Sequence, residues 1–385
     1  MNNFVYHNPV ELIFGKGTIA QLADNIPSDK RVLMCYGGGS IKRNGVYDQT
    51  MAALKNHKVA EIGGVEPNPR YETLMKAVEL GRQEQCDYVL AVGGGSVLDG
   101  VKFVAAAIPF DDGDPWKILS EQAKLKTALP LASVLTLPAT GSEANMNSVI
   151  SRDSTQEKLA FANPLVYPQF SIIDPETHTT LPERQTKNGI IDAFVHVMEQ
   201  YATYDVNAPL QTRQAEAILL TLLEEGPKAL ENPEDYDIRA NIAWAATQAL
   251  NGLINRGVPQ DWSTHLIGHE ITALWGLDHA QTLAVVLPAN MRYNKEAKSS
   301  KLIRMAEAVW GIDTSACADP AGAAIDKTEE FFRSLGVKTR LKEYDITEGI
   351  EKVAERIDAR GISGIGERQN IGKKEIQEIL DLCRE

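Results

Sequence analysis

Residues 87–107, DYVLAVGGGSVLDGVKFVAAA, place an apolar run, a glycine turn and a helix-like segment in direct succession. Other short apolar runs alternate with helix-like segments along the first half of the chain, at 31–36, 58–64, 131–138 and 170–175. Such alternation is typical of βαβ units, in which helices cover both faces of a mainly parallel sheet. We therefore predict an α/β domain over residues 1–180, with 147–152 and 158–164 as an inserted hairpin.

The second half of the chain has a different pattern. From about Leu181 the strand-like runs give way to apolar residues at helical spacing, as in the segments 184–203, 210–230 and 237–254. Pro182 lies near a probable helix start, where proline is well tolerated, and this suits a domain boundary. We predict an all-helical second domain over residues 181–385.

The bulk composition limits the classes of partner. The net charge is -13, which argues against nucleic acid and against an anionic membrane surface, because both require clustered positive charge. The N-terminus has neither a basic segment nor a long apolar one, and no apolar run reaches the length of a membrane span. Four cysteines without close pairing favour reduced thiols in a cytoplasmic protein: Cys35, Cys86, Cys317 and Cys383.

An acidic residue and several histidines form the candidate site of the second domain. Asp192 and His196 are four residues apart in DAFVH, so on a helix they project from one face. His265, His269 and His279 follow in THLIGHEITALWGLDH, the first two also four residues apart. A single histidine is more often a core or surface residue, but this combination suits a divalent metal such as zinc or ferrous iron.

The glycine turn of residues 93–96 is a candidate phosphate site. Glycines let the backbone approach a ligand closely, and the N-terminus of the following helix offers free N–H groups. Both features favour a phosphate at Gly94, Gly95 and Ser96. Asp99, one turn into the helix, could accept hydrogen bonds from a ribose or an amide, or stabilise the helix start. Because the fingerprint GxGxxG is absent, a tight turn without a ligand remains the alternative.

A second glycine turn, Gly37, Gly38, Gly39 and Ser40, follows the run 31–36. In dinucleotide-binding folds an acidic residue at such a strand end commonly holds the adenosine ribose and disfavours a 2′-phosphate. Here small residues leave room, and a serine followed by Lys42 and Arg43 suits a phosphate. We therefore expect NADP(H) rather than NAD(H), the alternative being a turn with solvated cations.

A third loop, TLPATGSEAN at 136–145, follows another predicted strand. Thr136, Thr140, Ser142 and Asn145 could contact the nicotinamide ribose or the pyrophosphate, although Ser142 could instead cap a helix. Lys158 lies beyond this loop and could reach a ribose hydroxyl.

Four motifs together resemble one family: GGGSVLDGVK, LPATGSEAN, DAFVH and the spacing H-x3-H-x9-H. Their order and spacing, from about residue 10 to residue 290, are similar to those of the iron-containing (group III) alcohol dehydrogenases. Phrases such as EPNPRYETLM and GLDHAQTLA are closer to the NADPH-dependent aldehyde reductase and butanol dehydrogenase branch. The sequence departs from the common family wording at Asp278–Ala280 and in a shortened loop at 138–143, which weakens any transfer of substrate preference.

The resemblance implies an arrangement that the spacing alone does not give. It implies a dinucleotide-binding domain, a helical metal-binding domain and an active site in the cleft between them. The metal ligands would be Asp192, His196, His265 and His279, and the metal iron, zinc or manganese. His269 would lie just outside this set, near the nicotinamide or the substrate. We consider it a candidate proton relay, the alternative being a residue that only braces the ligands. Asp99, Lys158 and Asn68, the last within EPNPRYETLM, would contact the cofactor. The family is usually dimeric or larger, and the strand VELIF at 10–14 could pair across subunits.

The expected function is metal-dependent hydride transfer between NADP(H) and an aldehyde or primary alcohol, most simply the reduction of short-chain aldehydes. One alternative is a metal- and NAD-dependent lyase similar to dehydroquinate synthase, which needs lysines and arginines around the metal. The segments that carry the ligands are instead apolar and aromatic, with Phe194, Trp262 and Trp275. A second alternative is a metal-binding protein without catalytic activity.

Overall fold

The computed structural model describes residues 1–362 and 364–384, and the chain forms two compact units. The sheet unit contains His7–Gln185 and Asn232–Thr247. The helical unit contains Met1–Tyr6, Thr186–Glu231 and Gln248–Glu385. The chain therefore returns to the sheet unit in the helix α8 (Tyr236–Ala249), a return that the predicted division at residue 180 does not include.

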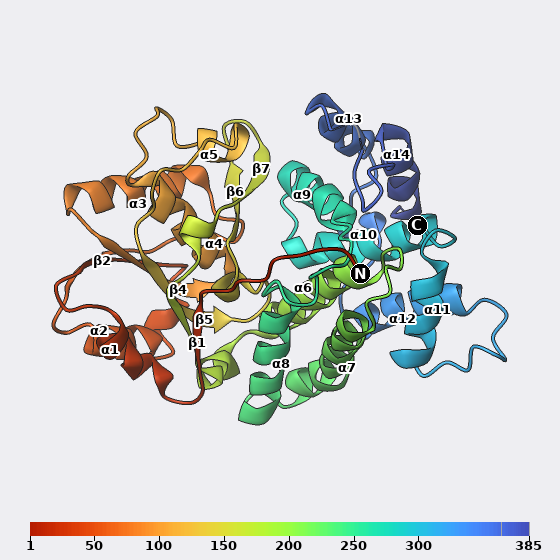
Figure 1. Cartoon of the computed structure of the whole chain (residues 1–385), viewed down its shortest axis with the longest axis horizontal. Helices are drawn as coiled ribbons and strands as arrows, with labels where there is room; N and C mark the ends of the chain where they lie inside the picture. The colour runs from red at the N-terminus through yellow and green to blue at the C-terminus, as the bar shows by residue number, and fades with distance from the viewer. Residues whose placement is uncertain (363, 385) are drawn as a thin grey trace. The chain divides into compact units, whose positions relative to one another are not determined.

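Six parallel strands form the sheet of the sheet unit (Figure 1), which confirms the predicted α/β fold. In spatial order they are β1 (Glu11–Phe14), β8 (Phe170–Ile173), β5 (Leu131–Leu137), β4 (Tyr88–Gly94), β2 (Arg31–Tyr36) and β3 (Lys58–Ile62). The segment predicted to pair across subunits forms β1, which pairs with β8 of the same chain. Among the described residues no strand pairs with its other edge.

Both faces of this sheet are covered, which explains the continuous apolar runs. Leu33 and Cys35 of β2 face a core that includes residues of α3 (Tyr71–Gln83) and α4 (Gly95–Ala107). Val32 and Met34 face a second core on the opposite side. That core is completed by residues of η1 (Thr18–Gln21), α1 (Leu22–Asn25) and α2 (Val46–Ala53).

Smaller elements complete the sheet unit. The predicted hairpin is present as β6 (Asn147–Arg152) paired with β7 (Glu157–Ala162) in antiparallel register. The short helices are η2 (Ser40–Lys42), α5 (Lys117–Ser120), η3 (Ser142–Ala144), η4 (Pro164–Val166) and η5 (Pro175–Thr180).

The helical unit is built around α6 (Glu183–Tyr201), which is buried along most of its length. Its other helices are α7 (Pro209–Glu231), α9 (Ser263–Trp275), α10 (His279–Tyr293), α11 (Ser299–Ala308), α12 (Pro320–Ser334), η6 (Leu341–Tyr344), α13 (Glu351–Ala359) and α14 (Lys373–Leu382). This confirms the predicted helical second half. No described helix has the length and apolar character needed to cross a membrane.

Candidate metal centre and cofactor loops

Asp192 and His196 lie on the buried face of α6, with exposed fractions of 3% and 4%. Their i, i+4 spacing places the Nδ1 atom of His196 3.8 Å from Oδ1 of Asp192. The neighbouring Phe194 points elsewhere, because its fully buried ring packs against Phe331 and Phe332. One side of α6 thus carries the polar pair Asp192 and His196, and another side carries Phe194, which packs in the hydrophobic core.

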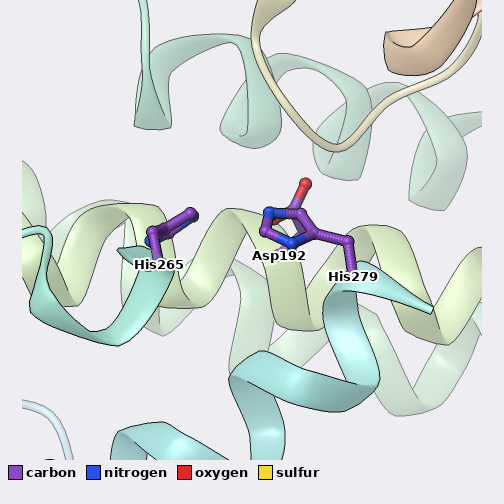
Figure 2. A group of neighbouring side chains, drawn as sticks. All are labelled: Asp192, His265 and His279. Atoms are coloured by element: carbon purple, nitrogen blue, oxygen red, sulfur yellow. The ribbon is translucent and has the colours of Figure 1, made fainter. Parts of the chain in front are cut away.

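Two further imidazoles join this pair from the next helices. His265 lies on α9, and His279 is the first residue of α10 (Figure 2). Between them α9 ends at Gly276, whose left-handed backbone (φ 71°) turns the chain toward α10. Asp278 precedes His279, accepts a hydrogen bond from Asn188 at 2.9 Å and donates its backbone N–H to the side-chain oxygen of Gln281 at 3.2 Å.

Asp192, His265 and His279 each offer one ligand atom, and these atoms all lie within 4.8 Å of one another. Nε2 of His279 is 3.6 Å from Oδ1 of Asp192, and the ring of His196 stacks on that of His265 at 4.7 Å between centroids. The 3.6 Å between His279 and Asp192 is close to the separation of two ligands that each lie about 2.0–2.2 Å from one ion. A carboxylate oxygen with imidazole nitrogens is also a donor set that suits a divalent transition metal.

His269 and Trp262 border this group. The ring centroid of His269 lies 5.2 Å from that of His279 and 6.2 Å from that of His265. The ring of Trp262 lies 5.2 Å from His265 and edges toward His196 at 6.2 Å. Of the aromatic residues noted in the sequence, Trp262 is therefore the one that contacts the imidazoles directly.

Glu199 is the residue of this region that the sequence analysis missed. Its carboxylate contacts Nδ1 of His265 and accepts a hydrogen bond from the backbone N–H of Thr264 at 2.7 Å. Burial raises the pKa of Glu199, the charge of Asp261 adds to the rise, and the hydrogen bonds from Thr264 oppose it. Its position, i+7 from Asp192 on α6, could have drawn attention to it, since such residues share a helix face.

The three predicted cofactor loops follow three neighbouring strands. Gly37–Ser40 follows β2, Gly94–Ser96 joins β4 to α4, and residues 138–145 follow β5. Because the strands are parallel and adjacent, the loops leave from the same edge of the sheet, where α/β proteins bind their ligands. Gly95 is also required by packing, since a Cβ there would lie 2.4 Å from Oγ1 of Thr140.

Asp99 is held by protein groups beneath these loops. It accepts hydrogen bonds from the Ser142 hydroxyl at 2.6 Å and from the Val149 backbone N–H at 3.0 Å. Lys102, fully buried one turn later, donates to Ser142 at 2.7 Å and to Asn145 at 3.1 Å. Burial lowers the pKa of Lys102 to about 8, although the charge of Asp99 opposes this. Lys102 was not singled out by the sequence, because a lysine within an apolar helix has no motif of its own.

Three predicted cofactor residues from distant segments, Asn68, Ser96 and Lys158, are joined by hydrogen bonds. Asn68 has a left-handed backbone (φ 55°), which asparagine tolerates better than most residues. Its backbone N–H donates to the hydroxyl of Ser96 at 3.3 Å, and its side-chain oxygen accepts from Nζ of Lys158 at 2.8 Å. Thr136, at the end of β5, is buried. The structure thus links Asn68, Ser96 and Lys158, while their contacts with a cofactor remain predictions.

The comparisons with known proteins agree with this geometry. Residues 9–175 match the family described as iron-containing alcohol dehydrogenase, and residues 186–383 match the C-terminal part of the same family. The chain belongs to the iron-containing alcohol dehydrogenase family. The predicted resemblance and the predicted oxidoreductase class are therefore confirmed, and the lyase alternative is not favoured.

Two curated members of this family are similar to the chain over its whole length. The NADPH-dependent aldehyde reductase YqhD of Escherichia coli K12 is 52% identical, with 100% of both chains covered. A probable NADH-dependent butanol dehydrogenase of Bacillus subtilis is 42% identical, with 99% of each covered. The crystal structure of E. coli YqhD superposes with a TM-score of 0.97 over 100% of this chain and 99% of that one.

Membership of the iron-containing alcohol dehydrogenases gives the buried polar face of α6 a reason. An uncompensated carboxylate is costly inside a helical core, so Asp192 needs cationic or hydrogen-bonding partners there. Within the helical unit those neighbours include the imidazoles of His265 and His279, and the three residues form a group that could hold a metal ion.

Proposed function

We propose that this protein reduces short-chain aldehydes to primary alcohols with NADPH as hydride donor. The observation that carries the proposal is the convergence of Asp192, His265 and His279 in a member of the iron-containing alcohol dehydrogenase family. The full-length similarity to an NADPH-dependent aldehyde reductase supports the same substrate class.

The metal centre would use four ligands: Asp192, His196, His265 and His279. When bound, a divalent ion supplies Lewis-acid polarisation of the substrate carbonyl. Iron, zinc and manganese all accept such a set. These residues would hold the ion beside the indole ring of Trp262, which lies 5.2 Å from the ring of His265, and an aromatic neighbour favours a small, weakly polar aldehyde.

His269 is the proposed proton donor to the oxygen of the product. Its ring centroid lies 6.2 Å from that of His265 and 5.2 Å from that of His279, so His269 borders the proposed ligands and would lie near a carbonyl bound there. Histidine suits this role because its ordinary pKa lies near neutrality.

The preference for NADPH rests on the loop Gly37–Ser40. The relatives include both NADPH-dependent and NADH-dependent enzymes, so overall similarity does not decide the cofactor. The loop carries no carboxylate where an NAD enzyme commonly has one, and Gly39 leaves open space around its Cα. Lys42 follows, its Nζ 5.0 Å and 4.6 Å from the rings of Tyr36 and Tyr47. The remaining proposed cofactor contacts are Gly94, Gly95, Ser96, Asp99, Asn68, Thr136, Thr140, Asn145 and Lys158.

We further propose a homodimer in the cytoplasm. No described strand pairs with the outer edge of β1, and the side chains of Phe4, Val5 and Phe14 are exposed. Both features support an additional protein partner, for which a second copy is the simplest candidate. All four cysteines are free thiols, as a reducing compartment would keep them.

The direct test mixes metal-loaded protein with butyraldehyde and NADPH and follows the absorbance of the reduced nicotinamide. We expect aldehyde-dependent oxidation that is faster with NADPH than with NADH. Absence of turnover across a panel of short aldehydes would favour a binding protein, and activity only on polyanionic substrates would favour the lyase.

The metal ligands are tested by His265→Ala. We expect this variant to lose bound metal and at least 100-fold in turnover, since a truncated ligand cannot be replaced from within the buried set. NADPH binding, measured by fluorescence titration, should change little because the cofactor loops belong to the sheet unit. Full metal content by elemental analysis would show that the ligand assignment is wrong.

A further inference from the structure

Glu199 lies on the same face of α6 as the proposed ligands. Asp192, His196 and Glu199 are spaced i, i+4 and i+7, so three polar side chains follow one stripe of a helix that is otherwise apolar at its centre. Glu199 has an exposed fraction of only 2%. A buried acid in such a position needs partners, and its two oxygens have different ones.

One carboxylate oxygen of Glu199 holds the start of α9. It accepts the backbone N–H of Thr264 at 2.7 Å, an N–H of the first helical turn that has no partner within the helix. The other oxygen contacts Nδ1 of His265, the next residue along α9. A single carboxylate therefore fixes both the helix start and the imidazole that follows it.

Because Nδ1 of His265 contacts Glu199, Nε2 is the nitrogen that would face the proposed metal. A neutral imidazole carries one N–H, and a proton on Nδ1 directed at Glu199 leaves the lone pair on Nε2. We propose that Glu199 is a positioning residue that fixes the tautomer and the ring orientation of His265 for metal binding. The proposal rests on the proposed metal site, and Glu199 itself is not a ligand.

The surroundings of Glu199 make this arrangement rigid. The backbone N–H of Asp261 donates to the carbonyl oxygen of Glu199 at 2.8 Å, and the Asp261 carboxylate is paired with Lys298. Lys298, almost fully buried, also donates to Glu367 at 2.9 Å. From α10, Asn290 donates to the hydroxyls of Ser263 and Thr264 at 2.8 Å and 3.0 Å. Groups from α6, from α10 and from the segments before α9 and α11 therefore hold the start of α9 where Glu199 meets His265.

The test compares zinc affinity of the full-length protein in wild type, Glu199→Gln and Glu270→Gln, by competition with a chromogenic chelator. Loss of the partner of a metal-bound histidine typically weakens metal affinity about 10–100-fold, and we expect a loss in this range for Glu199→Gln. Glu270 is the matched control, because it is a fully buried acid on α9 that pairs with Arg356 and Arg360 instead of a histidine. Its variant should bind zinc within about threefold of wild type.

Two further measurements separate the possible failures. If His265→Ala binds zinc as wild type does, the proposed metal site itself is wrong. If His265→Ala loses zinc while Glu199→Gln binds normally, only the role of Glu199 is overturned. The Michaelis constant for NADPH should be the same in Glu199→Gln as in wild type.

If Glu199→Gln does not fold, an NMR spectrum of the wild-type protein tests the predicted tautomer of His265. In zinc-loaded protein with ¹⁵N-labelled histidine, His265 should show a protonated Nδ1 with a strongly downfield proton, assigned by its absence in His265→Ala. A spectrum in which His265 carries its proton on Nε2, or in which Nδ1 is the metal-bound nitrogen, would overturn the proposal.

Discussion

At Gly39 the backbone has φ 88°, and a Cβ added there would meet no atom within 4 Å. We predict that Gly39→Asp lowers the NADPH-to-NADH ratio of kcat/KM at least tenfold, because a carboxylate facing the 2′-phosphate introduces repulsion between like charges. Steady-state kinetics with both cofactors at a fixed aldehyde concentration measure this ratio.

The control for this variant is Gly39→Ala. Both substitutions place a residue with a Cβ in a left-handed backbone conformation, which should cost about 1 kcal/mol of stability. Only the aspartate variant also adds a charge. If the alanine variant shifts the cofactor ratio as much as the aspartate variant does, the effect is conformational, and the placement of the 2′-phosphate at this loop is mistaken.

Single residues of the site differ in how far the sequence could predict them. Asp192, His196, His265, His269 and His279 were predicted as a group from their residue types and spacing, and the fold brings together ligand atoms of Asp192, His265 and His279. Glu199 and Lys102 escaped prediction because acids and lysines are common on helices, and burial is what makes these two unusual. Burial depends on tertiary packing, which the local pattern around each residue does not contain.

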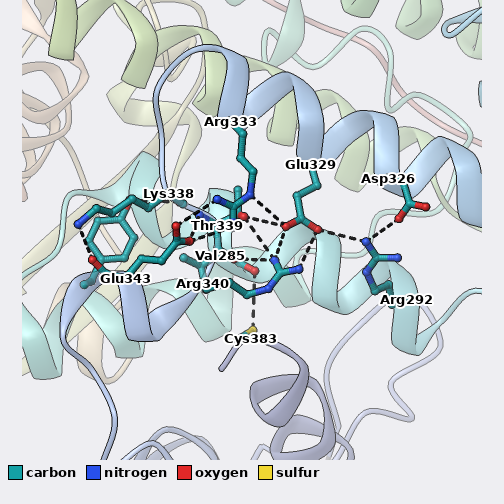
Figure 3. Close-up of polar contacts among 11 residues, drawn as sticks. Val285, Arg292, Asp326, Glu329, Arg333, Lys338, Thr339, Arg340, Glu343 and Cys383 are labelled. Atoms are coloured by element: carbon teal, nitrogen blue, oxygen red, sulfur yellow. Dashed lines mark hydrogen bonds and ion pairs between the residues drawn. The ribbon is translucent and has the colours of Figure 1, made fainter. Parts of the chain in front are cut away.

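At the scale of the elements, several segments of the helical unit are connected by an ion-pair network centred on Glu329 of α12 (Figure 3). Its carboxylate pairs with Arg340 through both oxygens, with Arg292 of α10 at 3.1 Å and with the hydroxyl of Thr339 at 2.8 Å. Burial opposes ionisation, but these partners outweigh it and lower the pKa of Glu329 to about 2. The network therefore ties α10 and α12 to the segment before η6.

We predict that Glu329→Gln lowers the free energy of unfolding by about 2 kcal/mol, less than for a fully buried pair because the arginines are partly exposed. A carboxyl whose folded pKa lies below the unfolded value stabilises the fold above the unfolded pKa, near 4.5. That contribution is lost as the pH falls from about 4.5 through about 2. Urea unfolding between pH 7 and pH 3 should therefore show wild type and variant converging in acid.

Glu330→Gln provides the comparison for that measurement. Glu330 is on the same helix but is exposed, and it pairs with the exposed Lys327 alone among the contacts described. Its variant should stay within about 0.5 kcal/mol of wild type at every pH. An equal loss in both variants would mean that helix propensity, and not the network, accounts for the effect of Glu329.

The sequence predicted which segments form strands and helices better than it predicted which elements pack against one another. The strands at 31–36, 131–138 and 170–175 were recognisable because a parallel sheet buried on both faces needs continuous apolar runs. The helix α8 was also expected as a helix, but its contacts lie with the sheet unit, where Ala243 joins the core and Trp244 meets Phe14 at 5.7 Å. Helical spacing shows that one face of a helix is buried, but it does not show against which element.

At the scale of the whole molecule, the proposed metal ligands and the proposed cofactor contacts belong to different units. Every proposed ligand lies in the helical unit, and every proposed cofactor residue lies in the sheet unit. The bound metal ion and the bound cofactor should therefore stabilise different parts of the chain, because binding stabilises the structure that forms the site. At 100 times its dissociation constant a ligand contributes about 2.7 kcal/mol, which can slow amide exchange by up to about 100-fold.

Hydrogen exchange followed by mass spectrometry measures this division. We predict that zinc added to metal-free protein slows exchange in residues 183–201 and 263–293, since α6, α9 and α10 carry the ligands. NADPH should slow exchange in residues 36–46, 93–107 and 136–149, where the three loops follow β2, β4 and β5. If zinc protects only the loops of the sheet unit, the metal does not bind at the imidazole cluster. If NADPH protects only α9 and α10, the cofactor does not bind at the glycine turns.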